Sequence, residues 1–182
     1  PLEQAPNVAN TIQPDYHYHL KTASNPAVSP NDKAVAYTLQ RFESGASEAS
    51  TDIFVKSLGD AASITQITNT GTASKPKWSP DAKKIAYLDL DESGVNQIFT
   101  RVASGGDPRA ITARPANVDA LAWSPDGTKI AFRSVVPDAE ELALINGDPD
   151  YPKIRTARRI RYRQDGVGWR GDSFYHLFVY DL

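Results

Sequence analysis

Cysteine and methionine are both absent from the sequence, and only three of its 182 residues are histidine. Without cysteine the chain forms no disulfide bond, thiolate nucleophile or cysteine-based metal site. No apolar run is long enough for a membrane span or a secretory signal peptide, so we expect no membrane partner. Because the chain starts at Pro1 and lacks methionine, we expect its natural start to be missing. The compartment stays open, since a cysteine-free chain tolerates both redox environments.

Neither sign of charge dominates the sequence. Twenty lysine and arginine residues face 22 aspartate and glutamate residues, which gives a net charge of −2, and 40% of the residues are hydrophobic. This balance allows an apolar core and argues neither for nor against a polyanionic partner. Composition therefore predicts a globular chain and no more.

The stretch AWSPDGTKIAF, residues 122–132, places a turn between two apolar segments. Pro125 presets φ at the second position of a tight turn, Asp126 tolerates the third, and Gly127 relieves the exit. One strand is therefore expected to enter at Trp123 and another to leave at Ile130.

The same pattern occurs three times in the sequence. KWSPDAKKIAY at 77–87 is a close copy and AVSPNDKAVAY at 27–37 a looser one, so the first serine of the turn recurs at steps of 50 and 45 residues. Such a period is typical of propellers and solenoids. The structural residues of the repeat are Trp78, Pro80, Asp81, Trp123, Pro125, Asp126 and Gly127. We expect Val28, Trp78 and Trp123 to be buried at equivalent positions, with the turns on one rim.

A third strand follows in all three units and a fourth in the first two, for example DIFVKSL at 52–58 and ITQIT at 64–68. Four short strands per unit are the blade of a β-propeller, so we predict an all-β partial propeller, a fragment of a longer chain with two complete blades and most of a third. The only helix candidate, 137–145, lies inside a loop. The expected divisions are an N-terminal extension and entry strand at 1–25 and the partial propeller at 26–182, with blades at about 26–70, 74–115 and 118–182 and an insert at 135–175.

These motifs carry a family resemblance. WSPDGTKIAF and ASGGDPRAIT resemble the repeats of TolB-type propellers and of the N-terminal propellers of the prolyl oligopeptidase family of serine peptidases. Within the insert, RYRQDGVGW (161–169) followed by HLFVYDL (176–182) resembles the propeller of acylaminoacyl-peptidase and of related dipeptidyl-peptidase-like enzymes.

The resemblance implies a missing C-terminal α/β-hydrolase domain of the same polypeptide, which carries a Ser-Asp-His triad. It implies that this propeller gates access of a peptide substrate, acylated or short, and it implies no cofactor. The alternative is a TolB-like propeller that acts as a non-catalytic protein-binding scaffold.

We assign no catalytic residue to the chain. GASEA at 45–49, around Ser47, lacks the second glycine of a Gly-x-Ser-x-Gly nucleophile elbow and lies in a polar loop between strands. The candidates for a general base are His17, His19 and His176, and His176 begins an expected strand. The chain alone is therefore not expected to hydrolyse peptides.

A metal site is not expected either. Asp15, His17 and His19 share one side of an extended segment because strand side chains alternate. Three such ligands suit zinc, but no fourth is indicated, so an edge strand with polar outer residues is the default.

The insert contains a run of basic residues, KIRTARRIRYR at 153–163. Phosphate binding is one interpretation, but the wider basic face that nucleic acid favours is missing, so we expect no nucleic acid partner. Arginine pairs readily with carboxylates at domain interfaces and binds peptide carboxylates in bidentate fashion. We therefore assign substrate or interdomain contact to Arg158, Arg159, Arg161 and Arg163.

The expected third blade stops after its third strand, which leaves a sheet edge open over 177–180. Open edges and uncovered blade faces recruit other strands. We therefore expect an isolated fragment to self-associate.

Overall fold

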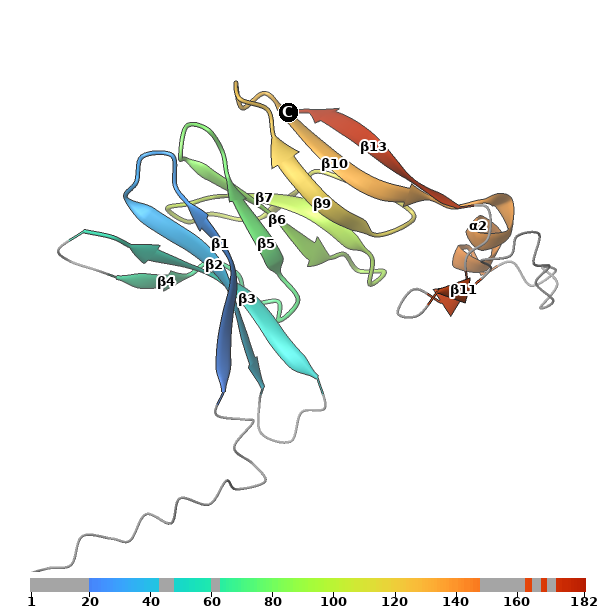
Figure 1. Cartoon of the computed structure of the whole chain (residues 1–182), viewed down its shortest axis with the longest axis horizontal. Coiled ribbons are helices and arrows are strands. Elements are labelled where there is room, and N and C mark those ends of the chain that lie inside the picture. Colours follow the sequence, from blue (N-terminus) through green and yellow to red (C-terminus); the bar gives the residue numbers. More distant parts are fainter. Residues whose placement is uncertain (1–19, 43–47, 60–62, 148–162, 165–167, 170–172) are drawn as a thin grey trace, which may run out of the picture.

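The computed structural model describes residues 20–42, 48–59, 63–147, 163–164, 168–169 and 173–182. Within them the chain forms three larger antiparallel sheets in sequence order, shown in Figure 1. This arrangement confirms the predicted all-β partial propeller. No helix among the described residues is long and apolar enough to cross a membrane.

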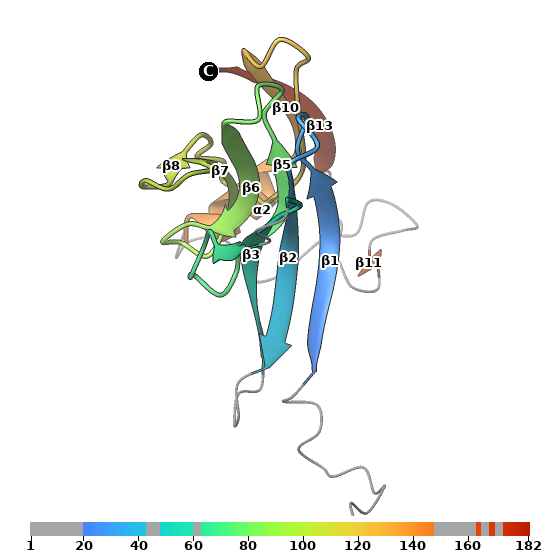
Figure 2. The same ribbon diagram turned by 90° about the vertical axis from the view of Figure 1, so that its left-hand side faces the viewer.

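The first two sheets have four strands each, paired in simple chain order. The first sheet contains β1 (Lys21–Val28), β2 (Ala34–Phe42), β3 (Ala49–Ser57) and β4 (Ile64–Gln66). The second contains β5 (Ser74–Trp78), β6 (Lys84–Leu90), β7 (Asn96–Val102) and β8 (Arg109–Ala110). In Figure 2 the second sheet runs outward from β5, which lies near β1, to β8. Strand β1 spans the division expected at residues 25 and 26.

The third sheet has three described strands, β9 (Val118–Trp123), β10 (Lys129–Val136) and β13 (Phe174–Asp181), in the order β13-β10-β9. Between β10 and β13 lie helix α2 (Ala139–Ile145) and a small hairpin of β11 (Arg163–Gln164) and β12 (Gly168–Trp169). Helix α2 is short, as expected from 137–145. It starts at Asp138, whose side chain accepts a hydrogen bond from the Glu141 amide, a typical N-cap.

The repeated turns explain why each unit carries Ser-Pro-Asp or Ser-Pro-Asn. In the second turn the Ser79 hydroxyl donates to the Asp81 carboxylate at 2.6 Å and accepts from the Lys84 amide at 2.9 Å. The Asp81 carboxylate also accepts from the Lys83 amide. The side chains of the turn therefore satisfy backbone donors that the strands leave open. Figure 1 shows all three turns on the same side of the molecule, as predicted.

The residue that leaves each turn has a positive φ. The values are 57° at Asp32, 58° at Ala82 and 72° at Gly127. Only the third copy places glycine, the residue that adopts this conformation at least cost, at this position. Gly127 thus stands at the turn exit with the positive φ that glycine adopts readily.

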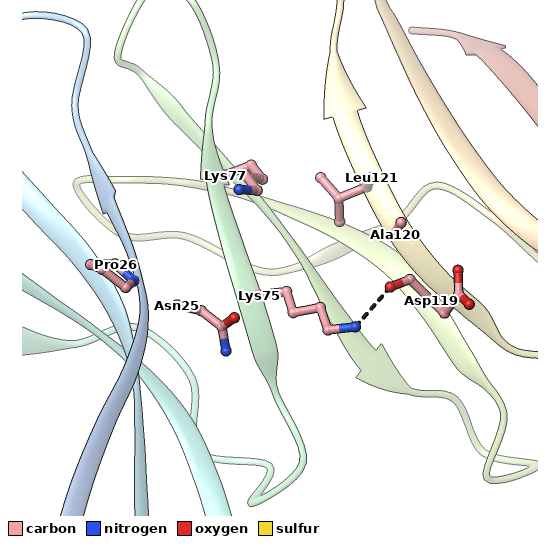
Figure 3. A pocket seen from close by; sticks show the side chains of 7 residues that line it. All are labelled: Asn25, Pro26, Lys75, Lys77, Asp119, Ala120 and Leu121. Atoms are coloured by element: carbon pink, nitrogen blue, oxygen red, sulfur yellow. Dashed lines mark hydrogen bonds between the residues drawn. The ribbon is translucent and has the colours of Figure 1, made fainter.

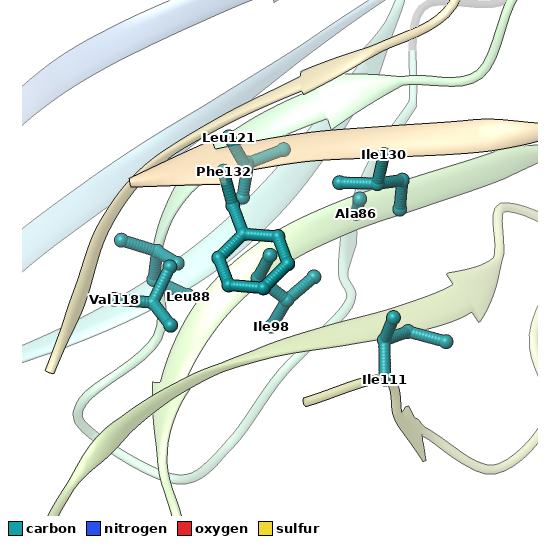
Figure 4. Close-up of a cluster of buried hydrophobic side chains, with 8 residues drawn as sticks. All are labelled: Ala86, Leu88, Ile98, Ile111, Val118, Leu121, Ile130 and Phe132. Atoms are coloured by element: carbon teal, nitrogen blue, oxygen red, sulfur yellow. The ribbon is translucent and has the colours of Figure 1, made fainter. Parts of the chain in front are cut away.

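Two apolar clusters fill the spaces between successive sheets. The cluster between the first and second sheets includes Ile53, Ile85 and Tyr87, all nearly inaccessible to solvent. The cluster between the second and third sheets, drawn in Figure 4, consists of Ala86, Leu88, Ile98, Ile111, Val118, Leu121, Ile130 and Phe132. Each of the first two sheets thus buries one face against the sheet that follows it, the packing expected of propeller blades.

The expected burial of the residue before each turn is wrong at Val28 and only partly right at the two tryptophans. Val28 is 57% exposed, whereas Trp78 and Trp123 are half-buried. Both tryptophans pack against a cluster between two sheets. Val28 belongs to the first sheet, and no described residue covers that side of it. Burial at this position therefore depends on a preceding blade.

Candidate functional site

The candidate site is a pocket of about 370 Å³ on the first strands of the three sheets. These strands, β1, β5 and β9, follow one another across the molecule, and successive ones are in contact. The pocket is lined by Asn25, Pro26, Lys75, Lys77, Asp119, Ala120 and Leu121, shown in Figure 3. Sequence analysis did not identify it, because its residues come from three repeats that are distant in the chain.

Matching β-bulges shape the pocket wall. The pairing register shifts between Ser24 and Ala27 in β1 and between Ser74 and Lys77 in β5. At each bulge one residue takes a positive φ, 50° at Asn25 and 54° at Lys75. Such backbone is uncommon for lysine and costs on the order of 1–3 kcal/mol, which surrounding structure must offset. The bulges therefore place two lining residues, Asn25 and Lys75, on left-handed backbone.

One lysine links two sheets across the pocket. Lys75 Nζ donates to the carbonyl oxygen of Asp119 at 2.7 Å, the contact marked in Figure 3. The Asp119 carboxylate accepts two hydrogen bonds from Arg133, at 2.7 Å from Nε and 2.6 Å from Nη2. This bidentate pair raises the pKa of Arg133. The Asp119 charge is thus already matched before any ligand is present.

Lys77 supplies the second ammonium group of the lining. Its backbone carbonyl accepts from the Trp123 indole at 3.1 Å, which fixes the backbone position. Its side chain is exposed and has no hydrogen bond or ion pair with the described part of the chain. With Asp119 neutralised by Arg133, the pocket has excess positive charge. It suits a carboxylate or a row of carbonyl oxygens.

Several residues singled out from the sequence lie outside the described residues. They are Asp15, His17, His19, Ser47, Arg158, Arg159 and Arg161. Arg163 is described only through its backbone, which pairs with Trp169 in the β11-β12 hairpin.

His176 lies on β13, exposed, with its ring centroid 6.3 Å from that of Phe178. Over the described ranges it has no hydrogen bond to a serine, and no group of three or more metal-ligating side chains is present. The packing or surface role expected for His176 fits this position.

A comparison with known protein families identifies the family to which the repeat belongs. The TolB beta propeller domain family matches residues 17–148, which is most of the chain. The chain belongs to this family. Its three described sheets are thus blades of a TolB-type propeller, and we number them blade 1, blade 2 and blade 3.

The similar curated proteins include peptidases. The uncharacterized peptidase YuxL of Bacillus subtilis is 22% identical over 161 residues, covering 88% of this chain and 24% of its own length. Dipeptidyl-peptidase 5 of Porphyromonas endodontalis is 27% identical over 137 residues, covering 75% of this chain and 20% of its own. The chain therefore spans about a quarter or less of the curated relatives it matches.

A solved peptidase structure has a similar fold. The acylaminoacyl peptidase of Pyrococcus horikoshii matches with a TM-score of 0.72 and 18% identity, over 91% of this chain and 24% of its own. At that identity the likeness shows the fold alone. Together the comparisons confirm the resemblance to peptidase propellers inferred from the repeats.

Proposed function

We propose that this TolB-type chain is the propeller portion of a serine peptidase of the prolyl oligopeptidase family, in which it controls access of short or acylated peptides. The observation that carries the proposal is the extent of the likeness to a peptidase, 88% of the chain for the Bacillus subtilis relative. The match to the family covers a shorter stretch, residues 17–148.

Peptide hydrolysis in such an enzyme requires a serine nucleophile, a histidine that transfers its proton and donors for the oxyanion. No such set occurs among the described residues. We assign this chemistry to an α/β-hydrolase domain elsewhere in the same polypeptide. The propeller would screen peptides by size and help to exclude water from the reaction.

The pocket on β1, β5 and β9 gives this role a chemical basis. A peptide passing along the first strands would present carbonyl oxygens or its C-terminal carboxylate to Lys75 and Lys77. Ammonium groups donate charge-assisted hydrogen bonds to both. For Arg158, Arg159, Arg161 and Arg163 we retain the proposal of contact with the peptide or with the hydrolase domain, because guanidinium groups suit both.

The second candidate function is a non-catalytic scaffold that binds protein partners. It is supported by the TolB family match itself. The two functions differ in what the rest of the open reading frame must encode. A peptidase needs a Gly-x-Ser-x-Gly motif after the remaining blades, whereas a scaffold does not.

The deciding experiment is to sequence the open reading frame beyond residue 182 and assay the whole protein. We expect the motif, and turnover of chromogenic peptides that is abolished when its serine is changed to alanine. A frame that completes the blades without the motif, or a whole protein without turnover, would favour the scaffold.

A further inference from the structure

One position of the repeat gives the pocket a different side chain from each of the three blades. The position lies three residues before the end of each first strand, and its occupants are Asn25, Lys75 and Ala120. All three residues line the pocket. Blade 1 therefore supplies an amide, blade 2 an ammonium group and blade 3 only a methyl group. The pocket is chemically asymmetric although a repeat builds it.

Asn25 suits the left-handed backbone at the β-bulge of β1. Its φ is 50°, and asparagine adopts this region more readily than most residues that have a side chain. Its Nδ2 donates to Ser24 Oγ at 3.2 Å, whereas Oδ1 accepts no hydrogen bond from the described part of the chain. In Figure 3 the amide points from β1 towards Lys75. Asn25 therefore offers the pocket an unused acceptor.

The unused donors of the pocket lie on β5, the strand next to this acceptor. An ammonium group has three N–H donors, and Lys75 gives one of them to the Asp119 carbonyl oxygen. Lys77 gives none to the described residues. The Asp119 carboxylate already accepts from Arg133, so it competes little with Asn25 for a donor on a ligand. A ligand that satisfies both strands must carry an N–H close to an anionic oxygen.

The last residue of a peptide has this combination, because its backbone N–H and its carboxylate are attached to the same Cα. An internal residue has the same N–H, but its neutral carbonyl oxygen makes weaker hydrogen bonds with ammonium groups than a carboxylate does. An inorganic anion would satisfy the lysines and leave the asparagine without a donor. The pocket volume of about 370 Å³ is in the range of small-ligand sites, about 300–1,000 Å³.

We propose that the pocket binds the C-terminal residue of a peptide, whose backbone N–H is donated to Asn25 Oδ1 and whose carboxylate is held by Lys75 and Lys77. Asn25 is then a specificity-determining residue. The inference rests on the proposed contact of the propeller with peptides and adds a requirement for the N–H. Peptides that end in proline or in an N-methylated residue lack this donor and are disfavoured.

An NMR titration of the chain with two acetylated tripeptides tests this requirement. Both peptides end in a free carboxylate, one at alanine and the other at N-methylalanine, so the charge is the same and the N–H is missing from one. We expect the alanine peptide to bind about fivefold more tightly, the effect of one hydrogen bond of about 1 kcal/mol. This comparison needs no variant of the protein.

Variants at position 25 separate the hydrogen bond from the size of the added methyl group. Asn25→Gly removes the acceptor and keeps the positive φ at no steric cost, and it should bring the ratio of the two affinities to about one. Asn25→Asp keeps an acceptor, so the ratio should stay near five although its charge weakens both complexes. The matched control is Asn146→Gly, at an exposed asparagine after helix α2 and outside the pocket lining, which should leave the ratio near five.

A change at the neighbouring lysine gives an independent readout. Lys77→Met should weaken the binding of both peptides and leave their ratio unchanged, because it acts on the carboxylate and not on the N–H. A fivefold ratio that persists in Asn25→Gly would overturn the inference, since the methyl group would then be excluded by its size. Equal binding of both peptides by the original chain would overturn the N–H requirement alone. Binding of neither peptide would also overturn the proposed contact of the propeller with peptides.

Discussion

The indole of Trp78 donates a hydrogen bond to the carbonyl oxygen of Ala27 at 3.0 Å, and this contact joins the first strands of blades 1 and 2. Trp123 makes the same contact one blade later, to the carbonyl of Lys77 at 3.1 Å. Each of these two tryptophans therefore donates its hydrogen bond to the blade that precedes its own. This explains why the position is half-buried in blades 2 and 3 and exposed at Val28 in blade 1.

Replacing Trp78 by phenylalanine should lower the free energy of unfolding by about 1 kcal/mol, because the ring is kept while the hydrogen bond to Ala27 is lost. Urea denaturation followed by circular dichroism measures this change. The control is Val28→Ala, at the equivalent exposed site, for which we expect a change within about 0.5 kcal/mol. Equal effects of the two variants would show that the indole contact contributes nothing.

The turn exits give a pair of substitutions with opposite signs. Ala82 has φ of 58°, so Ala82→Gly should raise the free energy of unfolding by about 0.5 kcal/mol, because glycine adopts this backbone without the steric cost. Gly127→Ala should lower it by about 1 kcal/mol at the equivalent site. A Cβ at Gly127 would meet the nearest heavy atom, Pro80 Cδ, at 3.4 Å, so the loss comes from the backbone. Two changes of the same sign in thermal unfolding would contradict this account.

The carboxylate of the third turn should make the stability of the fold depend on pH in acid. The hydrogen bond from Ser124, at 2.5 Å, and further donors in the turn lower the pKa of Asp126 from 3.8 to about 2. Because the pKa is lower in the folded state, the stabilisation is complete above pH about 4 and is lost as the pH falls towards 2.

Carboxyl chemical shifts in an NMR titration should give this value directly. Ser124→Ala should move the pKa of Asp126 back towards 3.8, and Asp126→Asn should remove its share of the acid-induced loss of stability. An unchanged pKa in Ser124→Ala would mean that the hydroxyl is not the cause.

The repeat could be recognised from sequence because its signals are local. Ser79, Pro80 and Asp81 form a turn through contacts with each other and with the adjacent strands, so the pattern alone predicted the blades. Burial at Val28 was mispredicted because it depends on a neighbouring blade, which pattern matching within one unit does not take into account.

The pocket was missed for a related reason. Lys75 and Asp119 meet only when successive blades pack, and a positive φ at Lys75 has no signature in a residue type that rarely adopts it. The one available signal was Lys75-Pro76-Lys77, which sets two lysines around a proline on a first strand, at the register of Asn25-Pro26 in blade 1.

The chain alone should not cleave peptides. Incubation with chromogenic peptides, acylated or with a free amino terminus, should give no turnover above buffer, because no Gly-x-Ser-x-Gly elbow is present in the sequence. A fluorophosphonate probe should label no serine, and Ser47 in particular should stay unmodified. Covalent labelling of Ser47, detected by mass spectrometry, would refute the assignment of catalysis to another domain.

The pocket should prefer peptides that end in a free carboxylate. Lys75 and Lys77 give it positive charge, while the Asp119 carboxylate is occupied by Arg133. In an NMR titration of the chain, an acetylated tripeptide with a free C-terminus should bind about fivefold more tightly than its amide, and Lys77→Met should remove most of this difference. Raising the ionic strength from 0.01 M to 1 M shortens the screening length from about 30 Å to about 3 Å and should have the same effect.

The matched control for this titration is Lys84→Met, which removes an exposed lysine beside the second turn, outside the pocket lining. Its loss should leave the preference for the free carboxylate intact, because Lys84 adds only to the overall charge. If Lys84→Met and Lys77→Met weaken binding equally, the preference reflects net charge and not the pocket. If acid and amide bind alike, Lys75 and Lys77 do not recognise a carboxylate, and peptide passage along the first strands would have to rest on contacts with carbonyl oxygens.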